Sequence, residues 1–142
     1  FYSFSGGWNI FKEDWFQFDW VNNLKLRASY GTVGNRPSAL YPQFDLYSVS
    51  TAASYNTSPG ALISQIGNQN LTWEQTATSD IGLDAAFLNN RLRVNFDYYN
   101  KNTKNILFQV PISGLTGVTS VWKNIGKMNN KGIELTLGAD VV

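Results

Sequence analysis

The sequence contains no cysteine and no histidine, and charged residues make up only 15% of its 142 positions. It therefore cannot supply a disulfide, a thiolate nucleophile, a zinc site of Cys and His ligands or a Ser-His-Asp triad. The formal net charge is only +1, which leaves no basic excess for binding nucleic acid. We expect no enzymatic activity, no metal or cofactor, and no nucleic-acid partner.

Long hydrophobic runs are also missing. No stretch approaches the roughly 18 to 20 apolar residues that a membrane-spanning helix needs. This absence does not exclude a transmembrane β-strand, which needs only about 9 to 11 residues with every second one apolar. Aromatic residues, by contrast, are plentiful at 15% of the chain.

Two neighbouring runs, residues 80–88 and 91–99, alternate between apolar and polar side chains and predict a β-hairpin. Asn89-Asn90 between them suits a two-residue type I′ turn, because Asn tolerates positive φ. With Leu88 opposite Arg91, apolar side chains face apolar ones and polar side chains face polar ones. The apolar pairs are Phe87 with Leu92, Ala85 with Val94, Leu83 with Phe96 and Ile81 with Tyr98; the polar pairs are Asp84 with Asn95 and Gly82 with Asp97, with Arg93 diagonal to Asp84.

The same alternation recurs in residues 2–8, 24–30, 106–110 and 133–139. It predicts an all-β fold, an antiparallel meander of long strands, with one short turn at residues 11–16. Two stretches break the alternation and are expected to be irregular loops. They are Gly31 to Gly67, which is rich in proline and tyrosine, and Pro111 to Thr119.

Alternation alone fits two kinds of β-protein. In a soluble sandwich the apolar faces pack on one another, whereas in a membrane barrel they face lipid and the polar faces line a lumen. The short Asn89-Asn90 turn and the long loops favour the barrel, whose connections are short on one side and long on the other. Tyr30, Tyr98 and Trp73 lie where apolar runs meet the loop side, as interface aromatic residues do.

Four blocks follow one another along the chain: residues 24–35 (LKLRASYGTVGN), 66–74 (IGNQNLTWE), 97–101 (DYYNK) and 124–135 (NIGKMNNKGIEL). In this order and at this spacing they resemble consecutive motifs of SusC/RagA-type TonB-linked outer-membrane transporters. The resemblance covers most of the chain and indicates a late part of their β-barrel.

The resemblance implies a barrel of about 22 strands in the bacterial outer membrane, of which residues 1–142 form a single C-terminal segment of roughly five or six strands. It implies import of oligosaccharides or peptides, with a SusD-like surface lipoprotein as lid and outer-membrane lipid around the barrel. The plug, through which the TonB complex acts, has no counterpart in these residues. We also expect the chain to be part of a longer polypeptide. The alternative is a non-transporting carbohydrate-binding or structural β-domain.

One block admits two interpretations. By residue type, Asn129-Asn130-Lys131-Gly132 predicts a hairpin turn. The resemblance instead places it within one long strand, from about Ser120 to Ala139, with a bulge at the block.

The candidate binding residues are aromatic side chains of the long loop, together with one tryptophan. Rings stack on sugar faces and also bury against each other, so they predict either contact with a ligand or partner, or packing within the loop. These residues are Tyr41, Phe44, Tyr47, Tyr55 and Trp122.

Charged side chains give two further hypotheses. Lysines at strand ends are candidates for lipid phosphates or are simply solvated; they are Lys101, Lys104, Lys127 and Lys131. Asp80 and Asp84 share a strand face, but about 13 Å of strand separates them. Glycoside hydrolases hold their two carboxyl groups roughly 5 to 9.5 Å apart, so lining of a polar lumen is the better interpretation.

Overall fold

The computed structural model describes residues 1–55 and 58–140, apart from the side chains of residues 52 and 55. Its elements are β1 (Ser3–Asn9), the 3₁₀ turn η1 (Ile10–Lys12), β2 (Val21–Asn35), β3 (Leu46–Tyr55), β4 (Ser58–Gln65), β5 (Glu74–Phe87), β6 (Leu92–Lys104), β7 (Leu107–Pro111), the 3₁₀ turn η2 (Gly114–Thr116), β8 (Ser120–Asn124) and β9 (Lys127–Ala139). Within these residues no helix has the length and apolar character to cross a membrane.

The chain divides into two compact units. The first, here the strand unit, comprises Phe1–Val33, Thr76–Thr103 and Met128–Val142. The second, here the loop unit, comprises Gly34–Gln75 and Lys104–Lys127. Each unit is described by itself below.

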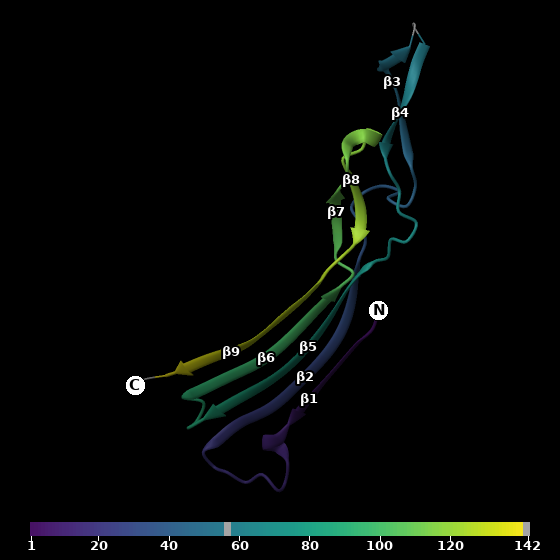
Figure 1. Ribbon diagram of the computed structural model, residues 1–142. Helices are drawn as coiled ribbons and strands as arrows, with labels where there is room; N and C mark the ends of the chain where they lie inside the picture. Colours follow the sequence, from purple (N-terminus) through teal and green to yellow (C-terminus); the bar gives the residue numbers. More distant parts are fainter. Residues whose placement is uncertain (56–57, 141–142) are drawn as a thin grey trace. The chain divides into compact units, whose positions relative to one another are not determined.

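The strand unit is one five-stranded sheet with the order β1-β2-β5-β6-β9 (Figure 1). Strands β1 and β2 are antiparallel, with Phe4 opposite Tyr30 and Trp8 opposite Leu26. Sequence neighbours in this series lie side by side, which is the predicted meander of long strands.

The predicted hairpin between β5 and β6 is confirmed. Asn89 and Asn90 have φ values of 54° and 65°, and the Arg91 N–H donates to the Leu88 carbonyl over 3.2 Å, as a type I′ turn requires. Asn95 Nδ2 lies 2.8 Å from Asp84 Oδ1, in keeping with the predicted opposition of these residues. Leu88 itself also has a positive φ, 53°, which the sequence did not indicate.

The loop unit corrects one expectation. Residues 31–67 are not an irregular loop, because β2 continues to Asn35 and residues 46–65 form the antiparallel hairpin of β3 and β4. Alternation identifies a strand only when its two faces meet different surroundings. Tyr47, Val49 and Leu62 in this hairpin are all exposed, so the sequence carried no contrast between faces.

The structure of the last part of the chain agrees only in part with what the sequence predicts. β7 and β8 pair across the predicted Pro111 to Thr119 loop, which contains η2. The block 129–132 lies inside β9, so it is not a hairpin turn. However, the expected strand from Ser120 to Ala139 is interrupted before Lys127, where Gly126 has a φ of 97°. The break falls at Gly126 because this left-handed conformation suits glycine.

The bulge expected at residues 129–132 stays a prediction. Asn129 Nδ2 donates to both Asn100 and Asn102 of β6, and Gly132 lies against Tyr99 of the same strand. These side-chain contacts tie β9 to β6 along the block.

Candidate functional site

One face of the sheet in the strand unit, here the apolar face, carries the alternating hydrophobic side chains. It remains uncovered: Phe96 is 37% exposed and Leu135 is 60% exposed. No large side chain among the described residues is fully buried. A sandwich would bury such a face against a second sheet, and none of the described strands does so. The surface suits contact with an apolar solvent outside the chain.

The opposite face, here the polar face, is organised around Arg27 of β2. Its Nε and Nη2 bind the two oxygens of Asp84 on β5 at 2.8 and 3.0 Å, and Nη2 also binds Asp97 Oδ1 on β6 at 2.9 Å. Asn95 Nδ2 donates to the same Asp84 carboxylate. One guanidinium therefore links three consecutive strands. The two carboxylate side chains are only about a quarter exposed, at 23% and 27%.

Gly82 makes this arrangement possible. It lies on β5 between the strands that carry Arg27 and Asp97. A Cβ at this position would overlap both the Asp97 carboxylate and the Arg27 guanidinium. The missing side chain allows the guanidinium to cross the middle strand.

A second glycine, Gly132, also leaves space for a side chain of the neighbouring strand. Gly132 of β9, within the last of the four motif blocks, lies beneath the phenol ring of Tyr99 on β6, and a Cβ there would overlap that ring. The glycine of this block is thereby explained as a recess for an aromatic side chain of the neighbouring strand.

Arg93 does not approach Asp84 in the way its diagonal position suggested. It binds Asp140 at the end of β9, with Nη2 to Oδ1 at 3.0 Å. Within the β5–β6 hairpin, Asp84 was the acidic residue expected nearest to Arg93. In the sheet, β9 lies beside β6 on the side away from β5 and brings Asp140 to Arg93. Both partners are more than half exposed, so this pair adds little stability.

The carboxylates of the polar face serve a structural network. Asp84 is engaged by Arg27 and Asn95, and therefore is not placed as a free acid or base beside Asp80. Among the described residues, no three acidic side chains gather into a group that would hold a metal ion.

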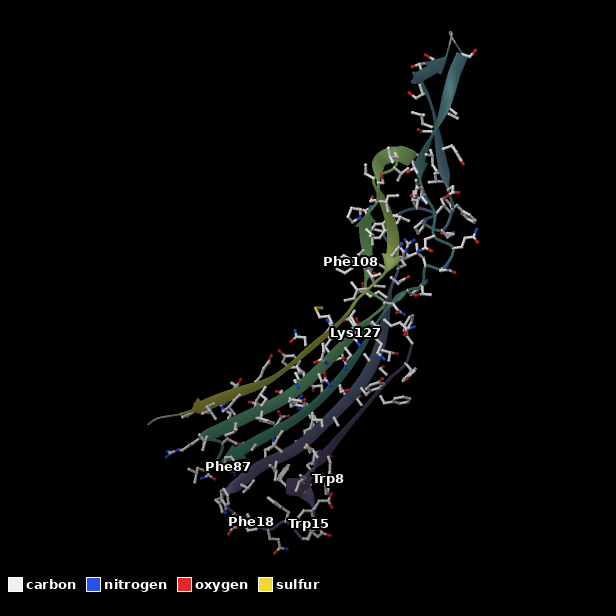
Figure 2. All side chains as sticks on the ribbon, in the orientation of Figure 1. Trp8, Trp15, Phe18, Phe87, Phe108 and Lys127 are labelled. Carbon is white, nitrogen blue, oxygen red and sulfur yellow. The ribbon has the colours of Figure 1, made fainter. Side chains whose placement is uncertain are left out.

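Aromatic rings mark both ends of the sheet. At the end from which the long excursions leave, Tyr2 contacts Phe4 and Tyr30, with ring centroids 5.7 and 6.1 Å apart. At the end with the short connections, rings of β1, of the connection to β2 and of β5 form a second group, labelled in part in Figure 2. Sequence reasoning found Tyr30 but missed this second group. The composition of this segment could have indicated the second group, because six of the thirteen residues in 8–20 are aromatic.

The loop unit contains a cavity of about 520 Å³. It is lined by residues on either side of the β3–β4 hairpin in the sequence, including Arg36, Tyr41, Gln69 and Trp73. None of the lining residues is acidic. The wall thus combines two large rings, amide groups and one guanidinium, a set that can contact sugar rings or peptide groups.

The structure separates the five predicted binding residues. Tyr41 lines the cavity, while Phe44, Tyr47 and Trp122 do not. Tyr47 lies opposite Ile63 in the hairpin, and Trp122 is half-buried opposite Gln109. The side chain of Tyr55 lies outside the described residues. Trp73, predicted only as an interface ring, joins Tyr41 at the cavity.

The backbone of Tyr41 is held in an unusual conformation. Its φ of 50° is rare for a residue with a side chain. The Tyr41 carbonyl accepts hydrogen bonds from the Phe44 N–H and from Gln65 Nε2, both at 3.0 Å. These contacts hold the backbone of Tyr41, whose residue lines the cavity.

Two asparagines of the motif blocks fasten the other wall. Asn124 Oδ1 accepts a hydrogen bond from the Thr72 N–H, and Asn124 Nδ2 donates to the Thr72 carbonyl, each at 2.8 Å. Nδ2 also donates to the Asn105 carbonyl. Asn68 Nδ2 donates to the Trp122 carbonyl at 2.9 Å. We call these contacts the asparagine clasp. They bring together blocks 66–74 and 124–135, which are far apart in the sequence.

The four predicted lysines are all exposed, and Figure 2 labels Lys127. None of them makes a salt bridge within the described part of the chain. Contact with lipid phosphates stays a prediction.

The chain is similar to known proteins in sequence and in fold. A sequence model of the family described as "TonB dependent receptor-like, beta-barrel" matches residues 2–140. The chain belongs to this family. TonB-dependent receptor P39 of Formosa agariphila is 37% identical over 134 residues, which cover 94% of this chain and 13% of that protein. SusC of Bacteroides thetaiotaomicron is 32% identical over 158 residues, covering 98% and 15%.

Solved structures also resemble this chain. The RagAB peptide importer in its closed-closed state matches with a TM-score of 0.85 and 32% identity, covering 99% of this chain and 15% of that chain. The siderophore receptor PirA of Pseudomonas aeruginosa, at 19% identity and a TM-score of 0.56, shares the fold over 95% of this chain and 24% of its own. The SusC/RagA resemblance and the all-β barrel-type meander are therefore confirmed.

The chain spans only 13% to 15% of the curated relatives and of RagAB. Its family is one of outer-membrane β-barrels whose members are named as receptors and importers rather than as enzymes, while the sheet described here is open.

Proposed function

We propose that this chain is a single C-terminal barrel segment of an outer-membrane importer of oligosaccharides or peptides. In this proposal a SusD-like surface lipoprotein covers the loop side. The TonB complex acts through a plug outside residues 1–142, outer-membrane lipid surrounds the apolar face, and the chain neither catalyses a reaction nor binds nucleic acid. RagAB is named as a peptide importer, which supports peptides as one of the two substrate classes. The similarity to SusC and RagAB supports the SusD-like lid.

The observation that carries this proposal is the two-faced sheet of the strand unit. Its apolar face is exposed, and its polar face carries an ion-pair network that links three strands. A barrel wall needs both surfaces at once, one against lipid and one against a watery lumen. The alternative, a carbohydrate-binding sandwich, needs a second layer over the apolar face.

We further propose that the loop unit is where the importer meets its substrate and its lid. The cavity wall of Tyr41 and Trp73 is the substrate contact, because rings and amides converge there. The exposed rings outside the cavity, Phe44 and Tyr47, together with Tyr55 and Trp122, are the candidates for contact with the lid or with other loops.

The test uses the full-length transporter with its lipoprotein in the outer membrane. Tyr41→Ala should raise the substrate concentration needed for half-maximal uptake, with normal surface expression and lid association. Leu115→Ala is the control, because Leu115 is 96% exposed, does not line the cavity and is not assigned to the lid; it should leave substrate affinity unchanged.

A second variant addresses the lid. Replacing residues 47–64 by a short Gly-Ser linker removes most of the β3–β4 hairpin but keeps Leu46 and Gln65, which pair with each other. Gln65 can then still donate to the Tyr41 carbonyl. We expect normal barrel assembly with loss of lid association or uptake. Survival of both functions would show that the hairpin is a passive cover and that Tyr47 and Tyr55 do not contact the lid.

A further inference from the structure

Arg36 is the one charged residue among those that line the cavity of the loop unit. It directly follows Asn35, the last residue of β2. Arg27 and Arg93 in the strand unit each bind a carboxylate, whereas Arg36 forms no salt bridge or hydrogen bond within the described part of the chain. The donors of its guanidinium are therefore available to a group from outside these residues.

The two acidic residues of the loop unit are engaged elsewhere. Asp45 Oδ1 accepts a hydrogen bond from the Gly67 N–H at 2.8 Å, and Glu74 Oε2 accepts one from the Leu107 N–H at 3.5 Å. Neither acid lines the cavity. Four basic residues against two acidic ones give the unit a net charge of +2; the basic ones are Arg36, Lys104, Lys123 and Lys127. An anionic ligand group therefore meets attraction at this wall.

Much of the remaining wall is aliphatic. Leu40, Pro42 and Leu71 line the cavity together with Tyr41 and Trp73, and Leu40 is 73% exposed. A sugar carries hydroxyl groups around its ring, and hydroxyls placed against aliphatic surface lose hydrogen bonds to water without replacement. An apolar peptide side chain has no such cost and is stabilised by leaving water. The aliphatic wall thus favours a peptide over an oligosaccharide.

Two glutamines supply partners for a peptide backbone. Gln43 and Gln69 both line the cavity, and neither side-chain amide has a hydrogen-bond partner among the described residues. An amide side chain can donate to a peptide carbonyl and accept from a peptide N–H. A guanidinium binds a carboxylate through two parallel hydrogen bonds. The wall therefore matches a peptide that brings a carboxylate beside an apolar side chain.

We propose that the cavity binds a peptide through one of its carboxylates, with Arg36 as the partner of that carboxylate and a neighbouring apolar side chain against the aliphatic wall. The carboxylate is the free C-terminus of the peptide or the side chain of an acidic residue, since both present the same group. This inference rests on the proposed function, because it narrows the substrate of the same cavity.

The experiment measures binding of synthetic peptides to the purified full-length transporter by isothermal titration calorimetry. The three probes are acetyl-Ala-Ala-Ala-Leu with a free C-terminus, the same peptide with an amidated C-terminus, and amidated acetyl-Ala-Ala-Glu-Leu. We expect a carboxylate-bearing probe to bind about tenfold or more tightly than the neutral amide. Tighter binding of the first probe identifies the C-terminus as the source of the carboxylate, and tighter binding of the third identifies the acidic side chain.

Variants of the loop unit assign the effect to one residue. Arg36→Gln should abolish the preference, so that charged and neutral probes bind alike. Arg36→Lys should keep only part of it, because Lys retains the charge but not the paired donors. Lys123→Gln is the matched control, since it removes the same charge from an exposed position of the same unit that does not line the cavity. It should retain the full preference.

Three outcomes would overturn the inference. The first is equal or undetectable binding of all three probes by the unmodified transporter. The second is the same loss of preference in Lys123→Gln as in Arg36→Gln, which would reduce the effect to net charge. The third is binding of an oligogalacturonate more tightly than any probe peptide, in a manner that Arg36→Gln abolishes, because the guanidinium would then serve an acidic sugar.

The uptake assay with Tyr41→Ala separates this inference from the proposed function. Impaired uptake in Tyr41→Ala, without any effect of Arg36→Gln on peptide binding, refutes the carboxylate partner and keeps the cavity as the substrate contact. If neither variant changes uptake or binding, the cavity is not the substrate contact, and that part of the proposed function is refuted as well.

Discussion

At the scale of single residues, the polar face depends on positions where a side chain is missing. Arg27 reaches Asp97 only because Gly82 leaves space above the intervening strand, and Tyr99 covers Gly132 in the same manner. Such pairs fix the register of neighbouring strands, since a shift by one residue would bring a Cβ against the ring or the guanidinium.

Gly82→Ala tests this account. The added methyl group would displace Arg27 or Asp97, and we expect a loss of about 1 to 3 kcal/mol in the free energy of unfolding. Denaturant titration of the full-length transporter in lipid vesicles measures it. Gly6→Ala is the matched control, because a Cβ at Gly6 meets nothing within 4 Å. The free energy of unfolding of this variant should be unchanged. Equal losses at both positions would argue against a specific role for the Gly82 recess.

The asparagine clasp gives a second prediction at this scale. Asn124→Ala removes three hydrogen bonds, two of them to the Thr72 backbone. We expect faster amide exchange in residues 68–75, consistent with a local loss of about 1 to 3 kcal/mol. Hydrogen-exchange mass spectrometry measures this change. Asn129→Ala, whose amide binds Asn100 and Asn102 in the strand unit, should leave that segment unaffected.

At the scale of elements, the β5–β6 hairpin allows the two faces of the sheet to be compared at neighbouring residues. We expect Phe96→Arg to prevent assembly or to cost about 2 to 4 kcal/mol, because it places a charge in the middle of the bilayer. Asn95→Arg, one residue away on the polar face beside Asp84, should be tolerated. Folding yield into vesicles measures both variants. Equal damage would refute the assignment of the two faces.

Sequence reasoning succeeded where the two faces of a strand have different surroundings. The β5–β6 register and its turn followed from alternation and from Asn89-Asn90. It failed for β3 and β4, because both faces of that hairpin are exposed and its sequence therefore does not alternate between apolar and polar residues. The partners of Arg27 were also missed, because β2 is separated from β5 by 38 residues and only the sheet order reveals that they are neighbours.

The candidate site was predicted only in part. Tyr41 was identified by its type and loop position, but its place in the cavity depends on Gln65 and on a left-handed backbone. Trp73 was assigned to the interface because it follows the long loop, and its approach to Tyr41 could not be seen without the hairpin that brings the loop ends together.

At the scale of the whole molecule, the buried hydrophobic side chains among the described residues are small: Ala85, Ala86, Val118 and Val121. The sheet has one layer, β1 and β9 form its two edges, and the apolar face is bare. Unpaired edges and an exposed hydrophobic surface promote association. We expect residues 1–142, expressed alone in buffer without detergent, to aggregate or to show no cooperative thermal transition. A monomer with a cooperative transition, by calorimetry and sedimentation, would contradict this account.

The central claim is that one face of this sheet lies in lipid and the other lines an aqueous lumen. Its most direct test is a cysteine scan of residues 92–99 on β6 in the full-length transporter, using the absence of natural cysteines in this segment. Lipid-borne nitroxide should quench labels at the even positions, and a water-soluble thiol reagent should react at the odd ones. An alternation with the opposite phase, or no alternation between lipid and water along β6, would contradict the account.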